Sequence, residues 1–253
     1  MFIGPDRFSL TRLPNRDEVK FVRLPTRTLK AGDSCNIVTI GVGHDVGAEK
    51  QLQSLFPKIC AFYGADPVEK INKELYESIG GRFFPFAVGS TSGNDTALVL
   101  GYEGDEFYKG QTVQHIDIVR FLRHYAGILS PIDVIILDVE GAEFEILPFL
   151  EPGNLLDDNN ITVCQWNIEL HWPSPEQNES FKRFIINTIR DERLSIRLYS
   201  CRKEHISCVR QIYAYPQSMY CMFEDGMQYR SFKSAYKLGN NASKICKLAF
   251  LHP

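Results

Sequence analysis

The sequence predicts an α/β fold built around a mainly parallel sheet. Between about residues 36 and 193, short apolar segments typical of buried strands alternate with amphipathic segments typical of helices. Strands separated by helices are joined by right-handed crossovers and pair in parallel. The apolar segments are nearly continuous, as expected for strands that are covered on both faces. In such sheets ligands bind beyond the carboxyl ends of the strands, so the loops after the strands should carry the chemistry.

The first half of the alternation contains three expected strands and two expected helices. The apolar strand segments are 36–43, 58–67 and 82–90, and the helical segments between them are 47–57 and 68–81. Pro57 ends the first helix, and the Gly80-Gly81 pair closes the second. A possible short strand around Val19–Leu24 precedes this alternation.

The second half continues the pattern and ends in antiparallel strands. In chain order we expect an accessory strand at about 96–104, a helix at 115–127 with Asp117 as its N-cap, a strand at 132–141, a helix at 142–153, a strand at 161–172 and a helix at 178–193. Segments 195–204 and 209–216 are expected to form a C-terminal antiparallel hairpin. The predicted organisation is therefore an N-terminal extension (1–34), one α/β domain (35–216) and a C-terminal extension (217–253) packed on the same domain.

Composition excludes several classes of protein. A formal net charge of -3 and scattered basic residues give no basic face, so nucleic acid is not an expected partner. No apolar run approaches the roughly 20 residues needed to span a bilayer. The first residues lack the apolar core of a signal peptide. We therefore expect a protein without a membrane span in this chain and a cytoplasmic location.

The cysteines and the glycosylation triplets bear on the compartment. Seven cysteines are spread along the chain without a C-x-x-C pair, which favours reduced core thiols and excludes a zinc motif. Asn-x-Ser/Thr triplets begin at Asn94, Asn160, Asn178 and Asn241. These triplets leave open a lumenal origin for a longer form of the protein.

Two candidate ligand positions follow the first two strands. Gly41 and Gly43 lie in "TIGVGHDVGAE", where a strand runs into a helix and the backbone can approach a ligand closely. The third glycine is Gly47, so the G-x-G-x-x-G fingerprint is absent and a nicotinamide-dependent oxidoreductase is disfavoured. Asp66 ends the second strand, where a carboxylate can bind both ribose hydroxyls or can merely cap the next helix.

The later strand ends supply small residues and acids. Ala87 and Val88, in "FAVGS", could line an adenine slot. In "ILDVEGAEFEIL", Asp138 and Glu140 end the fourth strand and point toward the expected cleft. Glu143 and Glu145 fall in the first turn of the next helix, where the helix dipole favours acids. His171 follows the fifth strand and is either a catalytic base or a packed histidine.

These motifs together resemble the FkbM-type methyltransferases. The resemblance runs from about Ile37 to His171 through the G-x-G loop, the strand-end Asp-Pro, "FAVG", "HIDIVRFL", "LDVEGAEFEIL" and "NIELH". The most specific element is "LDVEGAEFEIL", which matches the family's Asp-Val-Glu-Gly-x-Glu turn. The first loop looks like a divergent form found in animal and nematode members.

The resemblance implies a Rossmann-like class I methyltransferase fold with a mainly parallel seven-stranded sheet and S-adenosylmethionine as cofactor. It implies that Gly41, Gly43, Asp66, Ala87 and Val88 line the cofactor pocket. Thr39 replaces an acid that the family usually places in the first strand, and residues Tyr63-Gly64 look inserted before Asp66. Asp45 or Glu49 is then expected to supply the missing carboxylate near the cofactor.

The implied reaction is methyl transfer to an oxygen of a sugar or another small hydroxylated metabolite. Alcohol acceptors need a general base, and the candidates are Glu140, Asp138, His171 and Glu169, with Glu140 preferred. No metal site is expected, because the acids lack a histidine-rich ligand set. The alternative, supported by Thr39 and the insertion, is a catalytically silent Rossmann-like domain that binds a partner.

Overall fold

A computed structural model of the chain describes residues 10–16, 18–25, 32–101, 107–151, 153–171, 173–191, 197–199 and 211–214. The main sheet contains five parallel strands in the order β5 (Arg82–Phe84), β4 (Ala61–Ala65), β3 (Asn36–Ile40), β9 (Val134–Leu137) and β10 (Trp166–Ile168). Beyond β10 the sheet continues with β12 (Gln211–Ala214), which is antiparallel to β10, and β11 (Arg197–Tyr199), which is antiparallel to β12.

The parallel part of this sheet confirms the predicted α/β fold. Each strand is shorter than its apolar segment, because the segments also include turn residues at both ends. β11 and β12 fall inside the two segments predicted as a C-terminal hairpin. The remaining residues of those segments and the predicted extension 217–253 lie outside the described residues.

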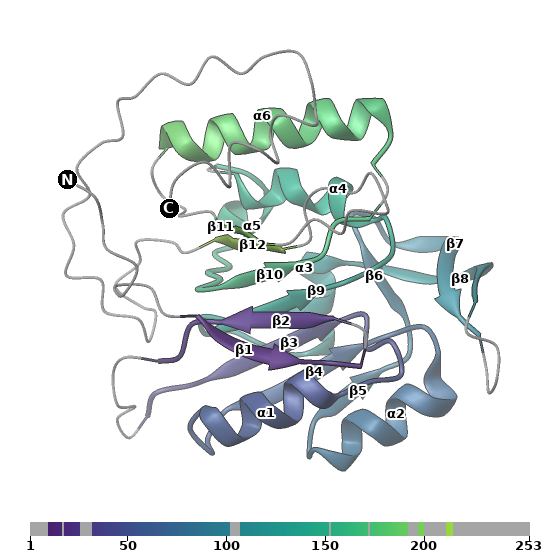
Figure 1. The fold of residues 1–253 in the computed structure, drawn as a ribbon, viewed down its shortest axis with the longest axis vertical. Coiled ribbons are helices and arrows are strands. Elements are labelled where there is room, and N and C mark those ends of the chain that lie inside the picture. The colour runs from purple at the N-terminus through teal and green to yellow at the C-terminus, as the bar shows by residue number, and fades with distance from the viewer. Residues whose placement is uncertain are drawn as a thin grey trace.

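Helices cover both faces of the sheet, with α1 (Gly47–Leu55) and α2 (Glu69–Ser78) on one side and α4 (Glu143–Ile146) and α6 (Pro175–Asp191) on the other (Figure 1). Alternate strand residues enter two separate cores. Ile37 packs in the core beside α1 and α2, whereas the adjacent Val38 packs in the core beside α4 and α6. Burial on both faces explains why the strand segments are continuous apolar runs rather than an alternating pattern.

An N-terminal hairpin completes the core beside α1. Its strands are β1 (Thr11–Pro14) and β2 (Val19–Val22), which agrees with the short strand expected near residue 19. Leu13 and Val22 are almost fully buried in that core. The backbone N–H of Arg23 donates to Oε1 of Gln165 at 2.7 Å, and Nδ2 of Asn167 donates to the carbonyl of Phe21 at 3.1 Å. The hairpin is therefore fixed to the segment around β10.

A second sheet leaves the main body. It consists of β6 (Ala87–Gly89), β8 (Tyr108–Asp117) and β7 (Gly93–Leu100), with β6 parallel and β7 antiparallel to β8. The prediction of one strand over 82–90 is wrong, because the strand is interrupted at Pro85 and β6 pairs in this second sheet. β7 and β8 project from the body as a hairpin (Figure 1).

Two predicted helices differ in extent from the observed ones. The segment 115–127 begins as strand, and its helix starts only at α3 (Ile118–Arg120), which continues as a π-helix over Phe121–Tyr125. Asp117 is the N-cap as predicted, since its Oδ1 accepts from the backbone N–H of Arg120 at 2.8 Å. The segment 142–153 contains α4 and a 3₁₀ turn over Leu147–Leu150 that includes Pro148. A short helix, α5 (Leu155–Asp158), follows.

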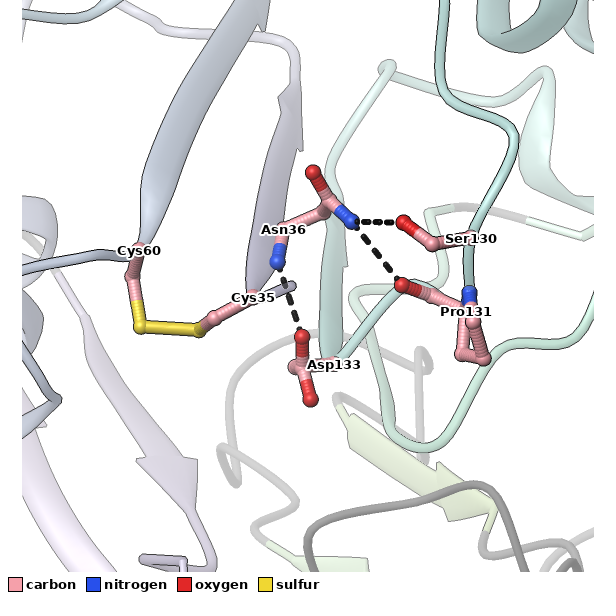
Figure 2. The surroundings of a disulfide bond; sticks show 6 residues. All are labelled: Cys35, Asn36, Cys60, Ser130, Pro131 and Asp133. Carbon is pink, nitrogen blue, oxygen red and sulfur yellow. Dashed lines mark hydrogen bonds between the residues drawn. A yellow bond between two sulfur atoms is a disulfide. The ribbon is translucent and has the colours of Figure 1, made fainter. Parts of the chain in front are cut away.

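The expectation of reduced core thiols is wrong for the cysteines that the structure describes. Cys35 and Cys60 form a disulfide with a Cα–Cα distance of 4.4 Å (Figure 2). Cys164 is also disulfide-bonded. Within the described part of the chain, every helix is too short or too polar to cross a lipid bilayer.

Candidate functional site

A cavity of about 450 Å³ lies at the carboxyl ends of β3, β4 and β9. The projecting hairpin β7–β8 contributes a further wall to it. The predicted site residues that line the cavity are Gly41, Gly43, Asp66, Ala87, Val88, Asp138, Glu140 and His171. The topological rule that places ligands at this edge therefore brings these predicted residues into one space, whereas Asp45 is not among the lining residues.

Gly41 is required where the first loop leaves β3. Its φ is +87°, and a Cβ atom at this position would lie 1.7 Å from the carbonyl oxygen of Asp138. The backbone N–H of Gly41 donates to the carbonyl of Ala65 at 2.9 Å. Only a residue without a side chain allows the loop to pass this close to the end of β9.

The carboxylate of Asp66 accepts hydrogen bonds both from the glycine loop (Gly41 to Gly43) and from the start of the next helix. Its Oδ2 accepts from the backbone N–H groups of Val42 at 2.9 Å and Gly43 at 3.2 Å. Its Oδ1 accepts from the backbone N–H of Val68 at 2.7 Å, at the start of α2. An ionised carboxylate offers about four lone-pair positions, so these three donors leave capacity for a ligand hydroxyl.

The two residues expected to compensate for Thr39 lie elsewhere. Asp45 accepts from the backbone N–H groups of Arg16 and Gly47, both at 2.7 Å, and so ties α1 to the N-terminal hairpin. Glu49 is buried and its Oε1 accepts from the hydroxyl of Thr39 at 2.9 Å. Neither carboxylate lines the cavity.

His44 and Asn72 belong to the cavity but were not predicted. The backbone N–H of His44 donates to Oδ1 of Asn72 at 2.9 Å. Nε2 of His44 and Nδ2 of Asn72 are buried, and neither has a hydrogen-bond partner in the structure. Burial lowers the pKa of His44, which favours the neutral imidazole. His44 lies inside the predicted G-x-G loop, whereas no motif marked Asn72.

Four carboxylates surround His171. Its Nδ1 lies 2.9 Å from Oε1 of Glu143. Its Nε2 faces the other three at 3.6 to 3.7 Å, namely Asp138, Glu140 and Glu169. Burial opposes the charge on His171, but the hydrogen bond to Glu143 and the neighbouring carboxylates outweigh it and raise the pKa to about 9. The ring is therefore an imidazolium at neutral pH.

Glu143 orients His171 and holds the turn that follows β9. It lies in the first turn of α4 as predicted, but its side chain is fully buried and folds back over its own loop. Its two oxygens accept from the backbone N–H groups of Val139 at 3.0 Å and Gly141 at 2.9 Å. Glu145 in the same turn lines the cavity and accepts from the hydroxyl of Ser90 at 2.6 Å.

Glu140 has a backbone conformation that non-glycine residues rarely adopt. Its φ is +54°, and Gly141 follows at +115°. Such strain is often stored at functional sites, where it aims a side chain. Oε2 of Glu140 is buried without a hydrogen-bond partner in the structure. Burial raises the pKa of Glu140, although His171 and a hydrogen bond from Tyr108 act in the opposite direction.

The N-terminal hairpin delivers a buried cation to the same cluster. Lys20 is 4% exposed, its Nζ lies 3.3 Å from Oδ2 of Asp138, and it also pairs with Glu18. Burial opposes the charge on Lys20, but Asp138 and Glu18 raise its pKa overall. Burial and a hydrogen bond with Glu18 raise the pKa of Glu169 to about 9, so Glu169 is protonated at neutral pH.

Two groups of side chains have the proximity that a metal site requires. They are Asp138, Glu143 and His171, and Glu18, Asp138 and Glu169. In the first group Glu143 and His171 already bond each other. In the second, Nζ of Lys20 already supplies a positive charge to Glu18 and Asp138. The positively charged side chains His171 and Lys20 thus already neutralise carboxylates of both groups, and we assign no metal ion to either group.

The charged side chains that line the cavity are acidic, with the exception of His171. The acidic side chains are Asp66, Asp138, Glu140 and Glu145. No lysine or arginine from the described part of the chain lines it. The cavity therefore favours uncharged or positively charged ligands.

Comparisons with known proteins agree with the motifs. The Methyltransferase FkbM domain matches residues 10–193, which is well over half of the chain. No curated protein matches the sequence.

Solved structures with a similar backbone trace include a protein from Clostridium thermocellum that is described as an rRNA methylase. It is 13% identical in sequence with a TM-score of 0.41, and the match covers 75% of this chain and 89% of that chain. Another is Aeropyrum pernix fibrillarin with natively bound S-adenosyl-L-methionine, with 18% identity and a TM-score of 0.37 over 76% of this chain and 69% of that chain. The family match and the cavity at the strand ends lead to one conclusion. The chain belongs to the FkbM methyltransferase domain family, and its cofactor is S-adenosylmethionine.

Proposed function

We propose that this methyltransferase transfers a methyl group to a hydroxyl oxygen of an uncharged acceptor, a sugar or another small metabolite. The observation that carries the proposal is Glu140, a carboxylate with a raised pKa on the cavity wall, whose Oε2 is buried without a hydrogen-bond partner. A group of this kind can accept the proton that a hydroxyl must lose.

The cavity residues fit the cofactor. Asp66 keeps acceptor capacity for a ribose hydroxyl, and Nε2 of His44 and Nδ2 of Asn72 are buried polar atoms that need partners. Ala87 and Val88 line the cavity, and small apolar side chains of this kind suit contact with a flat ring. S-adenosylmethionine supplies, when bound, a methyl group on a positively charged sulfur, and the acidic cavity is compatible with that charge.

Glu140 is the best candidate for the general base. Its raised pKa makes the ionised form a stronger base than an ordinary carboxylate. His171 was another candidate, but with a pKa of about 9 it already carries its proton at neutral pH. We assign His171 to a supporting role, in which its Nε2, 3.6 Å from Oε2, stabilises the ionised form of Glu140. Asp138 is less suited to proton transfer because it is paired with Lys20.

The charges in the cavity support an uncharged acceptor. A phosphorylated or carboxylated acceptor would be repelled by Asp138, Glu140 and Glu145. Among the described lining residues there is no lysine or arginine, and the imidazolium of His171 offsets only part of this repulsion. RNA or DNA would need lysine and arginine contacts to phosphate. A neutral polyol meets no such penalty.

The test combines binding with turnover. Titration calorimetry with S-adenosylhomocysteine, with NAD as the control ligand, should show micromolar binding of the first compound alone. A radiolabelled methyl-transfer assay across neutral glycosides and hydroxylated metabolites should then identify an acceptor. Glu140→Gln should lower kcat at least a hundredfold, with less than a threefold change in S-adenosylhomocysteine affinity.

Glu69→Gln is the matched control, because Glu69 lies on α2 in an exposed pair with Lys73 and outside the cavity. Full activity of Glu140→Gln would remove the base assignment. Absence of S-adenosylhomocysteine binding by the unmodified chain would instead favour the silent binding domain.

A further inference from the structure

The disulfide between Cys35 and Cys60 has a defined place in the fold (Figure 2). Cys35 immediately precedes β3, and Cys60 immediately precedes β4. The bond therefore joins the amino ends of two adjacent parallel strands. Their carboxyl ends lead directly into Gly41 and Asp66, which line the cavity.

The disulfide fixes the register between these two strands. They pair from Asn36 opposite Ala61 to Ile40 opposite Ala65, and the backbone N–H of Ala61 donates to the carbonyl of Cys35 at 2.9 Å. A slip of one residue would separate the two sulfur atoms and would turn every side chain to the opposite face. The covalent bond thus protects the alignment of the glycine loop with Asp66.

Hydrogen bonds tie the start of β3 to its other neighbour. The backbone N–H of Asn36 donates to Oδ2 of Asp133 at 2.8 Å. Nδ2 of Asn36 donates to the hydroxyl of Ser130 at 2.9 Å and to the carbonyl of Pro131 at 3.0 Å (Figure 2). The central strand is therefore anchored on both sides at the end opposite the cavity, which is the arrangement of a structural cross-link and not of a redox-active pair in the site.

All cysteines in the described part of the chain are oxidised. Cys35 is 2% exposed and Cys164 is 1% exposed, and each is in a disulfide. Cytosolic thiol systems keep cysteines reduced, whereas disulfides of this structural kind persist in oxidising compartments. Asn94 and Asn160, which begin Asn-x-Thr triplets, are exposed and thus accessible to the enzymes that attach N-linked glycans.

We propose that this methyltransferase folds and acts in an oxidising compartment, the secretory lumen or the extracellular space, with Cys35–Cys60 as a permanent cross-link of its cofactor-binding half. The expected cytoplasmic location is thereby replaced. The proposal does not depend on the identity of the acceptor.

The test is to produce the same chain in cultured animal cells in two ways, behind a cleavable secretion leader and in the cytosol. Peptide mapping without reduction should find the Cys35–Cys60 peptide pair linked in the secreted protein. The Cys35→Ala/Cys60→Ala variant, secreted in the same way, should unfold about 6–12 °C lower than the unmodified chain. Ser54→Ala, at an exposed position on α1, is the matched control and should leave the unfolding temperature unchanged.

Two results would overturn the proposal. One is free thiols at Cys35 and Cys60 in the secreted protein. The other is a cytosolic chain that is reduced at both positions yet equals the secreted chain in unfolding temperature and in S-adenosylhomocysteine affinity. A secreted chain with the linked pair but without S-adenosylhomocysteine binding would leave this proposal standing and remove the proposed function.

Discussion

At the residue scale, protons held by His171 and Glu169 link stability to pH. Both groups have a pKa of about 9 in the folded protein, well above ordinary values of about 6.5 for histidine and 4.5 for glutamate. Between about pH 6.5 and 9 the folded protein therefore holds protons that the unfolded chain releases. A group with a raised pKa contributes stability that is lost as pH rises through the folded-state value.

We predict that the free energy of unfolding falls by at least about 1 kcal/mol between pH 6.5 and pH 9. Urea denaturation at the two pH values, followed by circular dichroism, measures it. His171→Gln should show a smaller decline, because one of the two proton-binding groups is gone. Equal or greater stability at pH 9 would mean that the two groups do not hold these protons.

Alanine substitutions at Gly41 and Gly43 together test the geometry of the first loop. Both have positive φ, but a Cβ at Gly41 would collide with the backbone of Asp138, whereas a Cβ at Gly43 would meet nothing within 4 Å. Gly41→Ala should therefore lower the free energy of unfolding by about 3 kcal/mol or more and weaken S-adenosylhomocysteine binding. Gly43→Ala should cost only the backbone strain, about 1 kcal/mol. Denaturation and calorimetry measure both effects, and equal costs for the two variants would contradict the close approach of the loop to Asp138.

At the element scale, the hairpin β1–β2 is part of the acidic cluster and not only a cover for the core. Lys20 pairs with Glu18 and Asp138 in a buried setting. Removing one partner of a buried ion pair leaves uncompensated charge and typically costs about 3–5 kcal/mol. Lys20→Met should therefore destabilise the protein by that amount, as measured by urea denaturation.

Lys73→Met is the control for this prediction. Lys73 pairs with Glu69 at 3.1 Å on an exposed helix face, where solvent screens the charges and such pairs contribute little to stability. Similar small losses for both lysines would show that Lys20 is not held in the cluster. A loss confined to Lys20→Met would show that the N-terminal hairpin is needed to keep the acids of the site in place.

The same elements show which features a sequence can predict. The parallel strands followed from apolar segments separated by helices, and Gly41, Asp66, Asp138 and His171 met because strand ends share one edge of the sheet. Lys20 was missed because its partner Asp138 is 118 positions away and no local pattern joins them. The hydrogen bond of Glu143 to His171 was missed because the side chain folds back over its own turn. The sequence held a partial signal for the Cys35–Cys60 bond, since Cys35 directly precedes the first predicted strand segment and Cys60 lies near the start of the second.

At the scale of the whole molecule, the parts of the site come from far apart in the chain and share one electrostatic character. The glycine loop, the hairpin β7–β8 and the turn after β9 line the cavity, and its charged side chains are acidic with the exception of His171. At an effective dielectric constant of about 20, a negative charge about 6 Å from one carboxylate experiences a repulsion of about 3 kcal/mol. A second carboxylate adds to this repulsion, whereas the positive charge of His171 reduces it. The net repulsion therefore stays near this value.

We therefore predict that kcat/KM for a neutral glycoside exceeds that for the matching uronic acid or sugar phosphate by at least tenfold, about 1.4 kcal/mol. Competition assays with radiolabelled S-adenosylmethionine at low salt measure the ratio. Glu145→Gln should reduce this ratio of kcat/KM values, because Glu145 adds negative charge to the cavity wall. A higher salt concentration should reduce the ratio further, because salt screens the charges. Glu151→Gln, outside the cavity, should leave the ratio unchanged. Preference for the anionic member of a pair would show that residues beyond the described cavity govern acceptor choice, and the uncharged acceptor class would then have to be given up.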